Sequence, residues 1–123
     1  PRRGFLAASA VALLALPAGA TAGSNPDAVL IAACADHARR MDAINQWEGD
    51  DVETTPLWAP YIAACDAITD AKPRTMAGLL AKARAVKAEA LTPDGAENPD
   101  GTMAPIWSWQ IANDLLRLAG EAA

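Results

Sequence analysis

Apolar side chains recur at steps of three and four residues in four separate segments between residues 27 and 119. An α-helix turns once in about 3.6 residues, so this spacing gathers the apolar side chains on one helix face. Prolines and glycines divide the segments, and no stretch shows the alternation typical of a half-buried strand. The sequence therefore predicts an all-α fold, a small helical bundle of three to four helices that contains an antiparallel helical hairpin.

Capping and helix-breaking residues mark where each helix begins and ends. Asn25 and Pro26 precede the first apolar stripe, as a capping side chain and a first-turn proline do. Pro60 falls inside the second segment, so the regular helix there can begin at Thr55 or only near Pro60. The expected helices are residues 27–48, a segment from Thr55 or Pro60 to about residue 70, a segment that Thr75 caps and that ends near Leu91, and residues 104–119, which Gly120 terminates.

Residues 1–22 have the order of an export signal: a charged start, an alanine- and leucine-rich run, a helix breaker and a small-x-small cleavage site. The segment resembles the twin-arginine translocation signal. Two positions depart from that signal, because Pro1 stands where Ser or Thr is usual and Ala7 where Lys is usual. The residues that carry the signal are Arg2, Arg3, Phe5, Leu6, Ala20 and Ala22.

This leader divides the chain into a signal-peptide helix over residues 1–22 and a small acidic helical domain over residues 23–123. We expect cleavage after Ala22 and export of the domain to the periplasm or the medium through the twin-arginine pathway. Two alternatives remain open: residues 5–16 form an ordinary buried helix, or the leader stays uncleaved and anchors the chain.

The charge balance limits the partners that this chain can bind. It has 15 acidic residues against 10 Lys and Arg, a net charge of -5, and loss of the leader with Arg2 and Arg3 would make the domain more acidic still. Such a domain repels phosphate backbones and anionic lipids, so we expect no nucleic acid, and contact with a membrane only through an uncleaved leader. Four basic residues gather at a spacing that we interpret as a solvated helix face: Arg74, Lys82, Arg84 and Lys87.

A second stretch of the sequence is also similar to known proteins. Residues 75–85 read Thr-Met-Ala-Gly-Leu-Leu-Ala-Lys-Ala-Arg-Ala, and they follow a helix that carries Leu57 and Trp58. Together with the leader, this order resembles a loose group of small bacterial proteins that have an export-type leader, a helical hairpin, a Thr-x-Ala-Gly-Leu-x-Ala-Lys-Ala-Arg helix and a Trp- and Leu-rich last helix. The resemblance implies a helical fold and assigns no activity.

One face of the first expected helix carries side chains that can bind metal. Cys34, His37 and Met41 lie at i, i+3 and i+7, and Cys65 of the second helix can approach them. Sulfur and imidazole ligands suit copper and, less well, zinc. The same side chains continue the apolar stripe, so core packing is the preferred interpretation and we expect no cofactor. A small exported metal-binding protein that uses these three residues is the alternative function.

The two cysteines can instead form a disulfide between the first two helices. Cys34 and Cys65 would come close in an antiparallel hairpin, and an exported protein enters an oxidising space. The bridge would close a loop of about 30 residues and contribute roughly 3–4 kcal/mol to stability. Cysteine is also a common small core residue, so both possibilities stay open.

Catalytic chemistry has little support in this sequence. The single histidine, His37, has no recognisable nucleophile and acid around it, and there is no P-loop or dinucleotide-binding glycine pattern. An enzyme is therefore the least favoured class.

The last expected helix points to a different function. Its apolar side chains form two stripes, one through Trp107 and one through Trp109 and Leu116. Tryptophans two residues apart on a helix point in nearly opposite directions, so at least one of them can lie at an interface. We predict a non-catalytic interaction or accessory module that contacts another exported protein or a second copy of itself, with Trp107, Trp109 and Leu116 as the candidate interface.

Overall fold

The computed structural model describes residues 25–120. Within this range the chain forms four α-helices and one short 3₁₀ turn: α2 (Ala28–Asn45), η1 (Val52–Thr54), α3 (Trp58–Asp70), α4 (Met76–Ala90) and α5 (Ala104–Leu118). The predicted all-α bundle is thereby confirmed. The proposed signal peptide of residues 1–22 and its cleavage site lie outside the described residues.

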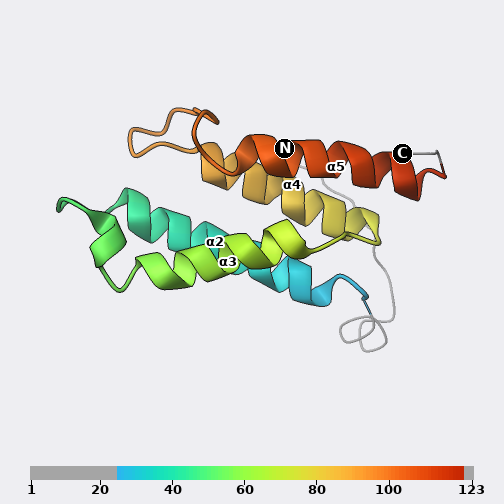
Figure 1. Cartoon of the computed structure of the whole chain (residues 1–123), viewed down its shortest axis with the longest axis horizontal. Helices are drawn as coiled ribbons and strands as arrows, with labels where there is room; N and C mark the ends of the chain where they lie inside the picture. Colours follow the sequence, from blue (N-terminus) through green and yellow to red (C-terminus); the bar gives the residue numbers. More distant parts are fainter. Residues whose placement is uncertain (1–24, 121–123) are drawn as a thin grey trace, which may run out of the picture.

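The bundle consists of two antiparallel hairpins that lie one above the other (Figure 1). Helices α2 and α3 form one hairpin, as the sequence predicts, and α4 and α5 form the other. Helix α4 packs on α2 as well as on α5, and α2 packs on α3 as well as on α4. The two inner helices therefore each have two main neighbours, whereas α3 and α5 each have one.

The helix ends follow from local chemistry. Pro60 is compatible with α3 because it falls in the first turn, where backbone N–H groups have no partner within the helix. The Thr75 hydroxyl accepts a hydrogen bond from the Gly78 amide at 3.1 Å, so Thr75 caps α4 as predicted. Gly120, with a φ of 85°, follows the end of α5 in the left-handed conformation that glycine tolerates best.

The hydrophobic core takes side chains from all four helices. Its buried members are Leu30, Cys34, Tyr61, Cys65, Ile68, Ala81, Ala85 and Trp107. Several apolar residues on the helices or just beyond their ends are at least a third exposed and stay outside the core: Trp47, Ile62, Leu80, Leu91, Trp109, Leu115 and Leu118. Most of these lie on the outer helices or at helix ends, where a second neighbouring helix is missing.

The connection between α4 and α5 folds back onto the end of α4. The Asn98 amide donates to the Ala90 carbonyl at 2.8 Å, and Leu91 pairs with Glu97 in an isolated antiparallel bridge. The start of α5 is thus held beside the end of α4. In the part of the chain that the structure describes, each helix is too short or too polar to cross a bilayer.

Candidate functional site

Four side chains from three helices form a buried polar cluster at the centre of the bundle: His37 of α2, Tyr61 and Cys65 of α3, and Glu89 of α4. Each is at most 7% exposed. Imidazole, phenol, thiol and carboxylate groups are seldom buried together in so small a domain, because each loses its hydration. Their hydrogen-bond partners must therefore come from the protein itself.

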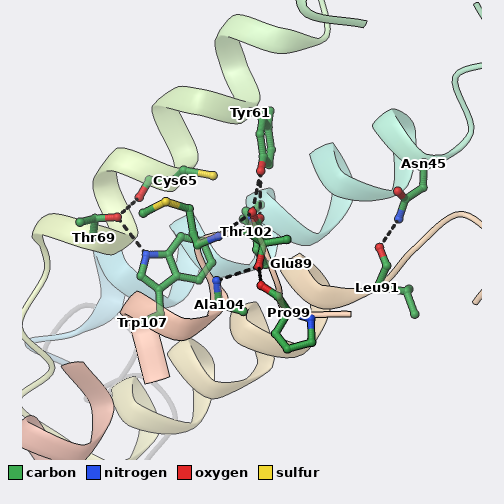
Figure 2. Close-up of polar contacts among 12 residues, drawn as sticks. Asn45, Tyr61, Cys65, Thr69, Glu89, Leu91, Pro99, Thr102, Ala104 and Trp107 are labelled. Carbon is green, nitrogen blue, oxygen red and sulfur yellow. Dashed lines mark hydrogen bonds and ion pairs between the residues drawn. The ribbon is translucent and has the colours of Figure 1, made fainter. Parts of the chain in front are cut away.

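Glu89 is the centre of this cluster (Figure 2). His37 Nε2 lies 2.8 Å from Glu89 Oε1, and the Tyr61 hydroxyl donates to Oε1 at 3.0 Å and to Oε2 at 2.8 Å. The Met103 amide, directly before α5, adds a bond to Oε2 at 3.3 Å. Burial alone raises the pKa of Glu89, but these hydrogen bonds outweigh burial and hold the pKa below its ordinary value. The carboxylate is therefore charged at neutral pH.

Aromatic rings enclose His37 on two sides. The ring centre of Tyr61 lies 5.9 Å from that of His37, and the ring of Trp107 lies 5.2 Å away in an edge-to-face arrangement. Trp107 is itself fixed, because its indole N–H donates to the Thr69 hydroxyl at 2.9 Å. His37 Nδ1 is buried and has no hydrogen-bond partner. Nε2 of His37 is thus hydrogen-bonded to Glu89, whereas Nδ1 is buried without a hydrogen-bond partner.

The cluster includes a set of atoms that can hold a metal ion. A ring nitrogen of His37, the Cys65 sulfur and a Glu89 oxygen all lie within 4.8 Å of one another. Of the three predicted ligands, only His37 belongs to this group. Cys34 is buried elsewhere in the core, and Met41 is half-buried and packs against the core cluster. Helix α3 therefore contributes the sulfur through Cys65, and α4 contributes an acid, Glu89, that is not among the predicted ligands.

A sequence signal for Glu89 does exist. Ala81, Ala85 and Glu89 follow one another at steps of four residues, so Glu89 lies on the same buried face of α4 as the two alanines. A charged residue in line with an apolar stripe is the pattern that would have identified it. Tyr61 gives a weaker signal, because a tyrosine in an apolar stripe is common.

The two cysteines, Cys34 and Cys65, are free thiols in the structure, and both are buried. Burial raises the pKa of Cys34 to about 11, although Lys82 nearby acts in the opposite direction. Burial likewise raises the pKa of Cys65 to about 11. Both side chains are therefore neutral thiols near pH 7.

The prediction of a solvated basic face is wrong at Lys82. Arg84 and Lys87 are exposed as expected, but Lys82 is fully buried and its ammonium donates to the Ala71 carbonyl at 3.2 Å. Burial lowers the pKa of Lys82, and the nearby Asp114 carboxylate partly opposes that shift. The prediction failed because α4 is an inner helix that packs on both sides, so little of its circumference faces water.

The structure separates the three residues of the candidate interface. Trp107 is completely buried, whereas Trp109 is 72% exposed and Leu116 is 41% exposed. Pro105 and Ala112 are also exposed, and together with Trp109 and Leu116 they recur at steps of four, three and four residues. We call these four residues the outer stripe of α5. It lies opposite the face through which Ala104 and Trp107 enter the core.

Comparisons of the chain with protein-family models, with curated proteins and with solved structures find no match.

Proposed function

We propose that this chain is a non-catalytic, exported helical module that works by contact with another protein through the outer stripe of α5. The observation that carries the proposal is the exposure of Trp109 at 72% in the middle of this stripe. Tryptophan is among the residues most enriched at the centres of protein interfaces, because its large ring gains much from the removal of water.

The spacing of the outer stripe favours another helix as its partner. Apolar positions at alternating steps of three and four are those that pack helix against helix. The stripe itself holds no charged side chain, although the chain as a whole has a net charge of -5. A second copy of the same stripe therefore meets no like charge in the contact, so we take the second copy as the partner, with two α5 helices related by a two-fold axis.

Export is the second half of the proposal. It is supported by the twin-arginine-like leader and by the resemblance of residues 75–85 to small proteins with such leaders. Twin-arginine export is a pathway for proteins that are already folded, which agrees with a domain whose helices form a common core.

Light scattering after size exclusion tests the interface. We expect the 123-residue chain to form a dimer, and the double variant Trp109→Ser, Leu116→Ser to be a monomer with an unchanged circular dichroism spectrum. Val29→Ser is the matched control, because Val29 is an apolar residue of α2 that is 83% exposed and lies away from the stripe. The control should remain a dimer, as should the chain without residues 1–22. A wild-type chain that is monomeric at all concentrations would contradict the proposal.

A further inference from the structure

We propose that His37, Cys65 and Glu89 form a binding site for one zinc ion, which joins α2, α3 and α4 at the centre of the bundle. The site is independent of the outer stripe of α5, so it goes beyond the interaction function. Its basis is geometric: three different donor groups from three helices have their atoms within 4.8 Å of one another in a dry interior.

The separation of the donors fits a small ion after modest adjustment. Zinc binds sulfur at about 2.3 Å and nitrogen or oxygen at about 2.0–2.2 Å, so two ligands of a tetrahedral ion lie roughly 3.3–3.8 Å apart. His37 Nε2 and Glu89 Oε1 are already 2.8 Å apart, and an ion between them would replace the hydrogen that they share. The Cys65 sulfur lies within 4.8 Å of both other donors, so it must move closer by about 1 Å or less to take the third position.

The mixture of donors selects zinc among the common ions. Calcium and magnesium take oxygen ligands, which here only Glu89 supplies. Cu(I) prefers sulfur and imidazole and gains little from a carboxylate. Zinc accepts nitrogen, sulfur and oxygen in one tetrahedral site, and the Tyr61 hydroxyl, which lies against Glu89, is the candidate fourth ligand.

Charge balance also favours a divalent cation. Glu89 is already a carboxylate, and ionisation of the Cys65 thiol would give the three ligands a charge of −2, which one zinc ion neutralises. Metal ions bind the thiolate form of cysteine, so binding releases the Cys65 proton and should strengthen as the pH rises. Tyr61 donates to both Glu89 oxygens and so holds the carboxylate in position.

All three ligands are buried, which is typical of a structural rather than a catalytic zinc site. Because all three ligands are buried, we expect an ion to enter most readily while the chain folds. The metal must therefore be present during refolding in the test.

The test uses the full 123-residue chain, unfolded under reducing conditions, freed of metal and refolded with Co²⁺. We expect one Co²⁺ per chain, an ultraviolet thiolate-to-cobalt charge-transfer band, loss of that band when Zn²⁺ displaces Co²⁺, and a higher Tm with Zn²⁺. Cys65→Ser should abolish the band, and Glu89→Gln should weaken binding at least tenfold. Cys34→Ser is the matched control, because Cys34 is equally buried and lies outside the group, and it should keep the band.

Two results would overturn the site: no band and no Tm shift in the wild-type chain, or loss of the band in Cys34→Ser with its retention in Cys65→Ser. If Cys65→Ser does not fold, proton release by the wild-type chain decides the question. We expect about one proton released per Zn²⁺ bound near pH 7, because the Cys65 thiol must ionise. Binding without proton release would place the ion elsewhere.

Discussion

His37 and Glu89 are 52 residues apart in the sequence, yet their side chains meet at 2.8 Å and are only 0% and 3% exposed. The pair joins the first helix of one hairpin to the first helix of the other. Buried polar pairs of this kind contribute little when complete, but they are costly to break, because the partner that remains has neither water nor a hydrogen bond. Substitution of either residue should therefore destabilise the fold.

Glu89→Gln keeps the size of the side chain and removes its charge. It should lower the free energy of unfolding by about 2–4 kcal/mol, because a neutral amide oxygen is a poorer acceptor for His37 and Tyr61 and the amide NH₂ lacks acceptors. Tyr61→Phe leaves Glu89 two other donors and should cost about 1–2 kcal/mol. Urea unfolding at pH 7 with a chelator present measures both. Losses under about 0.5 kcal/mol for both variants would contradict the assignment of Glu89 as the centre of the cluster.

The same carboxylate should make the fold sensitive to acid. The pKa of Glu89 in the folded chain lies below its ordinary value of 4.5, so its contribution to stability is fully present above pH 4.5. That contribution is lost as the pH falls from 4.5 through the lower folded value, because the unfolded chain binds the proton first. Urea midpoints between pH 5 and pH 3 should therefore fall less steeply in Glu89→Gln than in the wild type. Glu97→Gln, at an exposed position, should follow the wild-type slope.

Trp107 and Trp109 give a matched pair of substitutions in one helix. Trp107→Ala should cost about 3–5 kcal/mol, because it opens a cavity beside His37 and removes the indole bond to Thr69. Trp109→Ala should change the stability of the monomer by about 0.5 kcal/mol or less, since its side chain is mostly in water. Chemical unfolding in dilute solution, below the concentration at which the chain self-associates, compares the two. Equal costs would show that Trp109 is covered within the monomer.

Gly78 in the first turn of α4 should resist replacement by alanine. A Cβ at this position would overlap the carboxylate of Asp27, whose Cγ would be 2.6 Å away. That carboxylate is fixed by hydrogen bonds from the amides of Arg74 and Thr75 at 2.8–3.0 Å, so it has little freedom to move. Gly78→Ala should therefore destabilise by about 1–3 kcal/mol, despite the better helix propensity of alanine. Ser108→Ala on the exposed side of α5 is the control, and thermal unfolding should show no loss for it.

The helices could be predicted from the sequence because their signals are local. Thr75 caps α4 and Gly120 follows α5 where the sequence places them, since a cap acts within one helical turn. The main error in α2 is its end, which lies at Asn45 rather than at residue 48. Spacing also indicated that Trp107 and Trp109 point in different directions.

The cluster could not be predicted, because it depends on which helices become neighbours. The burial of Lys82 follows from α4 being an inner helix, and helical periodicity does not say how many sides of a helix are covered. Glu89 is buried for the same reason. Its hydrogen bonds with His37 and Tyr61 offset the free-energy cost of burying its charge. The predicted ligands Cys34, His37 and Met41 share one helix, with Cys65 approaching from the next, whereas the structure groups His37 and Cys65 with an acid from a third helix.

The hydrogen bond from the Met103 amide to Glu89 bears on how the domain unfolds. The segment that leads into α5 therefore bonds to the same carboxylate as His37 of α2 and Tyr61 of α3. All four helices are thus connected through Glu89 of α4. A fragment of α4 and α5 would keep only the Met103 bond to Glu89, and a fragment of α2 and α3 would lose the carboxylate altogether. The two halves should therefore lose structure together, in a single cooperative transition, and neither should persist as an independent folding unit.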